Sequence, residues 1–246
     1  DSISIIFQDP MTSLNPVYTI GNQIDEAIRL HTDRKGEAIR QRSIELLRLV
    51  GINDPARRVK QYPHELSGGM RQRVMIAMAL ACEPDILIAD EPTTALDVTI
   101  QAQILELIAD LQAQLGMAVI IITHDLGVIA DMCDEIIVMY AGSVCERGNT
   151  DDIFYSPKHE YTKNLLRSIP KAQKSNERLV PIAGNPIDLL NLPEGCAFAP
   201  RCRAAMKICL TEHPEELAMS ETQSAACWVN VRDQIMAETE QGGDRA

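Results

Sequence analysis

Near the middle of the chain, a short apolar run ends in two acids: Ile86-Leu87-Ile88-Ala89-Asp90-Glu91. Four apolar residues in a row suit a short buried strand, and Pro92 predicts that the strand ends after the acids. An amphipathic helix is predicted over 98–115, with Gly116 as its stop. A strand at 119–123, a helix at 126–133 and a strand at 135–139 are predicted to follow. This alternation predicts an α/β fold with a parallel sheet.

The flanking regions have different patterns. Upstream, a strand is predicted at 3–7, with helices at 21–30, 37–50 and 70–82. From about residue 170, Pro, Gly and Asn recur and long periodic runs stop, which predicts an irregular extension. We therefore expect five parts: a core strand and loop at 1–9, a helical subdomain at 10–82, the second half of the core at 83–169, an extension at 170–233, and a disordered tail at 234–246.

Composition excludes some classes of protein. The formal net charge of -12 argues against a nucleic-acid binder, whose surface should be basic. No apolar run approaches the roughly 20 residues that span a bilayer. The first residues lack the features of a signal peptide and there is no initiator Met, so we expect the chain to begin in mid-domain. Without an export signal, a reducing compartment is expected and disulfides are disfavoured.

Polar residues follow three of the predicted strands. Gln8 follows the first, the pair Asp90 and Glu91 ends the second, and His124 follows the third. Ligands bind at the carboxyl ends of strands in open α/β sheets. An acidic pair there suits magnesium-nucleotide chemistry, in which one carboxylate holds Mg²⁺ and the other orients a water. Each feature by itself also fits an ordinary strand end.

A Ser-Gly-Gly turn, Ser67-Gly68-Gly69, stands immediately before the helix predicted at 70–82. Glycines let backbone amides approach a ligand, and a helix N-terminus favours an anion. The alternative for this turn alone is a serine cap followed by glycines.

Together, these motifs resemble the nucleotide-binding subunit of an ABC transporter over residues 1 to about 150. The resemblance implies a partial RecA-like P-loop NTPase core with an inserted helical subdomain, ATP as nucleotide and Mg²⁺ as metal. Gln8 would sense the metal and the attacking water, Asp90 would serve Mg²⁺, Glu91 would be the catalytic base, and His124 would contact the γ-phosphate. Ser67, Gly68 and Gly69 would bind the γ-phosphate of ATP held by a second subunit in a head-to-tail dimer, and Asp97 would cross the interface of that dimer. The matching segments are Gln8, Leu66-Ser67-Gly68-Gly69-Met70-Arg71-Gln72-Arg73, Asp90-Glu91-Pro92-Thr93-Thr94-Ala95-Leu96-Asp97 and His124.

The chain departs from this family in one respect. The phosphate loop, Gly-x-x-x-x-Gly-Lys-Ser/Thr, is not in the sequence, which contains no Gly-Lys pair. The backbone amides and the lysine of that loop contribute most of the affinity for the phosphates of the nucleotide. We therefore expect this chain alone to bind ATP negligibly and to be inactive.

Two further segments resemble the dipeptide, oligopeptide and nickel importers of that family. They are 9–16, after Gln8, and the extension around 181–202. The resemblance implies an ATPase that drives peptide import across the inner membrane from its cytoplasmic face. Its partners would be a second ATPase subunit, two transmembrane permease subunits and, indirectly, a substrate-binding protein, with no nucleic acid. A nickel importer, a soluble ABC ATPase of DNA repair or translation and a non-catalytic module are the alternatives.

Four cysteines in the extension are spaced C-x5-C-x6-C-x17-C: Cys196, Cys202, Cys209 and Cys227. Thiolate quartets hold zinc or an iron–sulfur cluster, and structural zinc usually shows shorter gaps. The resemblance to importers whose extension carries a [4Fe–4S] cluster favours the cluster, with zinc and free thiols as alternatives. Cys82, Cys133 and Cys145 are expected to be small core residues.

Overall fold

The computed structural model describes residues 2–94, 96–168 and 181–243 of the 246-residue chain. The chain divides into two compact units, 1–125 and 126–246. Ala95 of the predicted motif and the expected boundary near residue 170 lie outside the described residues.

A three-stranded parallel sheet forms the core of the first unit. Its strands are β1 (Ile3–Ile6), β2 (Ile86–Asp90) and β3 (Ala118–Ile122), in the order β1-β2-β3. Ile3 pairs with Ile86, and Ile86 pairs in turn with Ala118. Since the three strands run in the same direction, the residues that follow them gather at one edge. The predicted α/β fold with a parallel sheet is confirmed.

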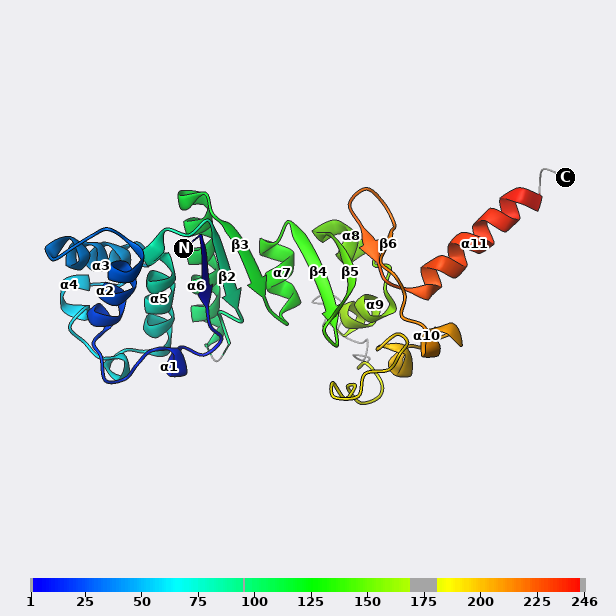
Figure 1. Ribbon diagram of the computed structural model, residues 1–246, viewed down its shortest axis with the longest axis horizontal. Coiled ribbons are helices and arrows are strands. Elements are labelled where there is room, and N and C mark those ends of the chain that lie inside the picture. The colour runs from blue at the N-terminus through cyan, green and yellow to red at the C-terminus, as the bar shows by residue number, and fades with distance from the viewer. Residues whose placement is uncertain (1, 95, 169–180, 244–246) are drawn as a thin grey trace. The chain divides into compact units, whose positions relative to one another are not determined.

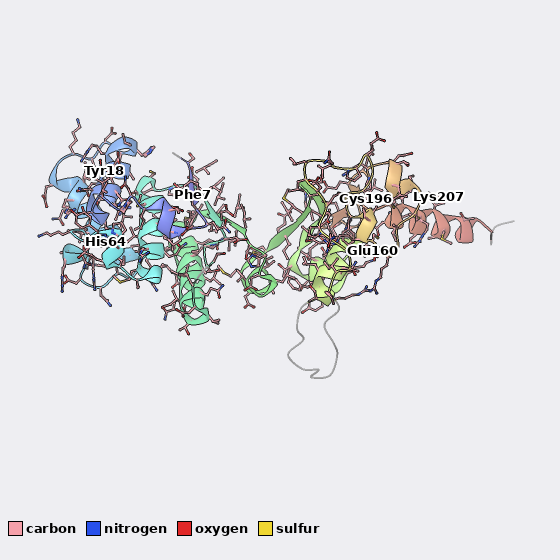
Figure 2. The ribbon with its side chains drawn as sticks, turned by 90° about the horizontal axis from the view of Figure 1, so that it is seen from below. Phe7, Tyr18, His64, Glu160, Cys196 and Lys207 are labelled. Atoms are coloured by element: carbon pink, nitrogen blue, oxygen red, sulfur yellow. The ribbon has the colours of Figure 1, made fainter. Side chains whose placement is uncertain are left out.

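Helices pack beside this sheet, with α5 between it and a group of helices that includes α2 and α3 (Figure 1). Tyr18 and His64 lie in this helical part, and Phe7 lies near the sheet (Figure 2). Isoleucines of α2 at helical spacing, Ile20, Ile24 and Ile28, are fully buried, as the amphipathic pattern requires. The helices of the unit are α1 (Pro10–Ser13), α2 (Ile20–His31), α3 (Glu37–Leu49), α4 (Pro55–Arg58), η1 (Pro63–Glu65), α5 (Gly68–Ala79), η2 (Leu80–Cys82) and α6 (Val98–Leu115).

The two faces of the sheet differ in burial. Leu87 and Ala89 are fully buried, whereas Ile5 and Ile120 remain 43% and 51% exposed. Successive side chains of a strand point to opposite faces, so the exposed isoleucines belong to one face. The first strand is therefore only half-buried, although its apolar composition alone suggests full burial.

The second unit contains an antiparallel sheet in the order β4-β5-β7-β6. Its strands are β4 (Glu135–Tyr140), β5 (Ser143–Asn149), β6 (Leu217–Ala218) and β7 (Ser224–Ala225). The expectation that 135–139 continues the parallel alternation is wrong, because β4 pairs antiparallel with β5. The cause is the turn between them, where Ala141 and Gly142 have φ of 50° and 82°. Two successive positive φ values are what a two-residue hairpin requires.

Two helices, α8 (Thr150–Tyr155) and α9 (Glu160–Arg167), contact this second sheet. Its core joins Ile136 and Val138 of β4 to Ile153 of α8. The residues predicted to be a disordered tail are instead helical as far as Gly243, as part of α11. The helices are α7 (Leu126–Met132), α8 (Thr150–Tyr155), α9 (Glu160–Arg167), η3 (Ala199–Arg201), α10 (Ile208–Thr211) and α11 (Trp228–Gly243). Within 2–94, 96–168 and 181–243, no helix is both long enough and apolar enough to cross a membrane.

Candidate functional site

The carboxylate of Glu91 gathers side chains from the ends of all three parallel strands. Gln8, just after β1, donates from Nε2 to Glu91 Oε2 at 2.6 Å. His124, just after β3, places Nδ1 3.0 Å from Glu91 Oε1. Three residues predicted to form one site are thus brought together at the carboxyl edge of the sheet, as the parallel arrangement demands.

The backbone of Glu91 has an unusual conformation for a residue with a side chain. Its φ is 43°, in the left-handed region that non-glycine residues seldom adopt. The amide of Glu91 still donates to the carbonyl of Ile122 at 2.8 Å, so the chain turns away from the sheet only beyond this bond. Backbone strain of this kind clusters at functional sites.

Hydrogen bonds also set the charge state of Glu91. The hydroxyl of Thr94 and then His124 are the main causes that lower the pKa of the Glu91 carboxyl below its ordinary value. Each accepted hydrogen bond favours the ionised form. Glu91 is therefore a carboxylate at neutral pH and accepts from all its neighbours.

Thr94 is a member of this site that our sequence reading missed. Its hydroxyl donates to Glu91 Oε2 at 2.7 Å, and its amide donates to the carbonyl of Glu91 at 3.1 Å. The available signal was a hydroxyl three residues after an acid in a turn, a spacing that allows local side-chain bonds.

Asp90 is the last residue of β2 and is half-buried beside Glu91. Mg²⁺ in nucleotide sites is held by one or two carboxylates together with phosphate oxygens and water. A carboxylate at the strand end next to Glu91 fits that requirement, so these residues suit the metal predicted for them.

The other predicted nucleotide contacts stand at two helix N-termini. Ser67 caps α5 by accepting from the Met70 amide, and Asp97 caps α6 by accepting from the Ile100 amide. A Cβ on Gly69 would come within 2.7 Å of Ile100 Cγ2. The Ser-Gly-Gly turn is therefore packed against the start of α6, and its second glycine permits that close approach.

In the second unit, the four cysteines of the extension line one small cavity with Phe198 and Trp228. Burial raises the pKa of the Cys202 thiol to about 11 and also raises those of Cys196 and Cys227. All seven cysteines of the chain are free. Glu160 and Cys196 mark this region in Figure 2.

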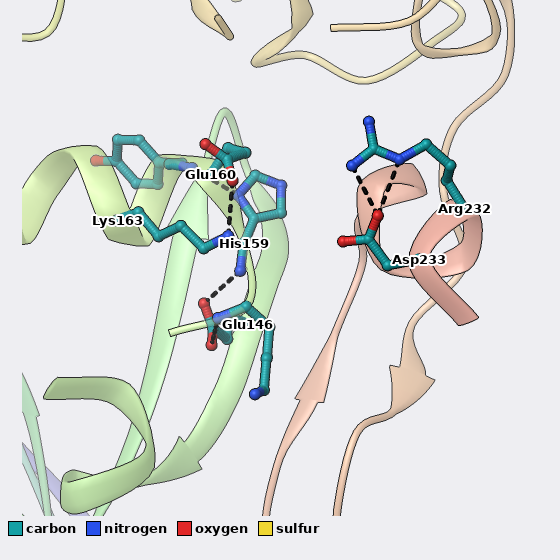
Figure 3. Close-up of polar contacts among 8 residues, drawn as sticks. Glu146, His159, Glu160, Lys163, Arg232 and Asp233 are labelled. Atoms are coloured by element: carbon teal, nitrogen blue, oxygen red, sulfur yellow. Dashed lines mark hydrogen bonds and ion pairs between the residues drawn. The ribbon is translucent and has the colours of Figure 1, made fainter. Parts of the chain in front are cut away.

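A buried carboxylate, also missed from sequence, lies close to this cavity. Glu146 is fully buried and accepts a hydrogen bond from the amide of His159 (Figure 3). It also accepts from the amide of Lys158 and from the side chain of Gln223. Three donors satisfy a charge that would otherwise be costly to bury. Glu146 thereby ties β5 to the segment before α9 and to the start of β7.

Comparison with known proteins relates both halves of the chain to one class. Residues 1–94 match the ABC transporter family, and residues 145–209 match the C-terminal region of oligopeptide/dipeptide transporters. The dipeptide transport ATP-binding protein DppD of Bacillus subtilis is 54% identical over 92% of this chain and 68% of its own length. The oligopeptide transport ATP-binding protein OppD of the same organism is 55% identical over 92% of this chain and 64% of its own length. The chain thus spans about two thirds of these relatives.

Solved structures agree on the fold. CbiO1 from Clostridium perfringens, part of an ABC transporter complex, is 34% identical with a TM-score of 0.55, over 63% of this chain and 60% of its own. A dimeric ATP-binding cassette in a post-hydrolysis state with ADP and Pi is 32% identical with a TM-score of 0.53, over 61% of this chain and 63% of its own. Both are ABC proteins, as the predicted RecA-like fold class requires.

The predicted [4Fe–4S] cluster at Cys196, Cys202, Cys209 and Cys227 is wrong. Among the residues described, no group of three or more Cys, His, Asp or Glu side chains is arranged to hold a metal. Neither the ABC transporter family nor the similar DppD protein is described with such a cluster.

Proposed function

This chain belongs to the family of ATP-binding proteins of peptide ABC transporters. On that premise we propose that it is part of the subunit that hydrolyses ATP to drive the import of dipeptides or oligopeptides. The relatives DppD and OppD are dipeptide and oligopeptide transport proteins, which favours peptides over nickel and over a soluble ABC ATPase.

The observation that carries the proposal is the convergence of Gln8 and His124 on the Glu91 carboxylate. Glu91 acts as the base that takes a proton from the attacking water. Asp90 would hold Mg²⁺, and the metal would supply positive charge that stabilises the phosphates. Gln8 orients the attacking water, and His124 donates to the γ-phosphate. Each role needs a side chain at the carboxyl edge of the sheet.

We assign the Ser67–Gly69 turn and Asp97 to the nucleotide of a second subunit. Both stand at exposed helix N-termini, where amides and the helix dipole favour phosphate. In a head-to-tail dimer each chain completes the site of the other. ATP then joins the two subunits, and hydrolysis releases them.

The remaining partners are two transmembrane permease subunits and, through them, a substrate-binding protein, at the cytoplasmic face of the inner membrane. A groove on α2 lined by Tyr18, Asn22 and Glu26 supports a docking site for the permease. Val17 and Tyr18 at its start are 72% and 53% exposed. Apolar side chains beside a polar groove suit a helix of a partner protein.

Glu91→Gln tests the assignment. The amide keeps the shape of the side chain and cannot accept the proton of the water, so ATP hydrolysis by the subunit as its gene encodes it should fall at least about 100-fold. Dimers that form with ATP should persist. Glu106→Gln, the same change at an exposed position of α6, is the control. Hydrolysis at an unchanged rate in Glu91→Gln excludes the proposed role.

A further inference from the structure

Thr94 touches the reacting carboxylate from within the same turn. We propose that Thr94 is a positioning residue that fixes the Glu91 carboxylate for its reaction with water; the inference rests on the proposed function. Its Oγ1 donates to Glu91 Oε2 at 2.7 Å.

The turn itself is firmly anchored. The Thr94 amide donates to the Glu91 carbonyl at 3.1 Å, so backbone and side chain of Thr94 both bind Glu91. The neighbouring Thr93 is buried, and its hydroxyl accepts from the side chain of Gln101 on α6 at 3.3 Å. Because the turn is tied to α6 in this way, the Thr94 hydroxyl is held in place.

The three donors to Glu91 are not equivalent. Gln8 and His124 reach it from other strands, and the His124 side chain is 80% exposed. In the proposed reaction Gln8 also orients the attacking water and His124 also binds the γ-phosphate. Their hydrogen bonds to Glu91 are therefore replaced by these other contacts when the nucleotide is bound. Thr94 has no such second task. It retains Oε2 while Oε1 becomes available to the water.

The Glu91 side chain needs a hydrogen-bond donor that fixes its orientation, because the side chain is otherwise free to rotate. Its side chain has three rotatable bonds, and its φ of 43° places it outside the regular strand geometry that would otherwise direct it. One fixed hydrogen bond at Oε2 restricts that freedom before water arrives. Orientation of this kind acts on the rate of the chemical step, whereas nucleotide binding depends on other groups.

The first test is kinetic and uses the subunit as its gene encodes it. Thr94→Val should lower kcat at least about tenfold and change KM for ATP less than about twofold. Thr94→Ser keeps the hydroxyl and should retain kcat within about twofold. Thr99→Val makes the same change at an exposed position of α6 and serves as control. An unchanged kcat in Thr94→Val, or an equal loss in Thr94→Ser, overturns the inference.

The second test separates this inference from the proposed function. In the 246-residue chain, NMR of the Gln8 side-chain amide and the His124 ring reports on the carboxylate that both contact. Thr94→Val should shift and broaden these signals, while Thr94→Ser and Thr99→Val leave them in place. Unchanged signals in Thr94→Val mean that Thr94 does not hold Glu91. If the unmutated subunit fails to hydrolyse ATP, the proposed function is wrong, and the NMR result still decides the contact.

Discussion

At the scale of single residues, two buried polar side chains of the second unit accept hydrogen bonds from backbone amides at the start of α9. Glu146 accepts from the His159 amide, and the His159 ring in turn accepts from the Tyr161 amide to cap α9 (Figure 3). His159 is only 2% exposed, and burial lowers its pKa from 6.5 to about 4. A neutral imidazole is therefore built into the start of α9.

This burial predicts an acid-sensitive second unit. Above pH 6.5 the imidazole is neutral in both the folded and the unfolded chain. As the pH falls from 6.5 towards 4, only the unfolded chain takes up the proton, so stability is lost. His159→Asn keeps a capping acceptor for the Tyr161 amide but does not titrate.

Urea unfolding at pH 7.5 and at pH 5.5 measures the effect. The loss of unfolding free energy between these two values should be smaller in His159→Asn by about 1 kcal/mol. His213→Asn makes the same change at an exposed histidine of the same unit and serves as the control. An identical pH dependence in His159→Asn and the unmutated chain contradicts a buried neutral imidazole.

At the scale of elements, the contact between α5 and α6 couples two of the predicted nucleotide motifs. Gly69 of α5 lies against Ile100 of α6, and Gly68 lies near Leu96 in the loop that follows Glu91. The second glycine of the Ser-Gly-Gly turn therefore has a packing role within its own subunit, in addition to the role proposed for it at the partner's nucleotide.

Gly69→Ala should destabilise the chain by about 1–2 kcal/mol, because its Cβ would meet Ile100 Cγ2 at 2.7 Å and overpacking outweighs the better helix propensity of alanine. Gly68→Ala is the matched control, since its Cβ would lie at an ordinary 3.5 Å from Leu96. Denaturant unfolding provides the measurement. In the double variant Gly69→Ala with Ile100→Ala, the two costs should be less than additive. Additive costs would show that the two side chains do not meet.

At the scale of the whole molecule, the chain carries the groups assigned to hydrolysis without the phosphate loop. Gln8, Glu91 and His124 meet at the sheet edge, yet no Gly-Lys pair occurs in the sequence. Phosphate binding by the phosphate loop and activation of water by Glu91 depend on different groups of the protein.

Isothermal titration calorimetry of the 246-residue chain with ATP and Mg²⁺ should show no binding, because the amides and lysine that dominate phosphate affinity are not in its sequence. A phosphate-loop ATPase of known affinity, titrated in the same buffer, is the positive control. Micromolar binding by this chain would contradict the prediction.

The sequence by itself determined the parallel sheet, the helix at 98–115, the helix predicted at 37–50 and observed at 37–49, and the shared sheet edge of Gln8, Glu91 and His124. Each of these follows from local patterns: apolar runs of strand length, helical spacing, and polar residues at strand ends. Residues 98–115 are helical as predicted, and Gly116 has the positive φ expected of a stop. The edge where Gln8, Glu91 and His124 meet could be foreseen because parallel strands end on the same side.

Only the tertiary structure decided three other matters. The partner of the strand at 135–140 depends on a two-residue turn whose φ values are not visible in composition. The thiol pKa values of Cys196 and Cys202 depend on burial, which raises them and is set by the packing of the extension. Thr94 joined the site because the left-handed turn at Glu91 folds its hydroxyl back onto the carboxylate. The spacing of residues in the sequence identifies the side chains that can react. The packing of the folded chain determines which groups surround those side chains and how their pKa values shift.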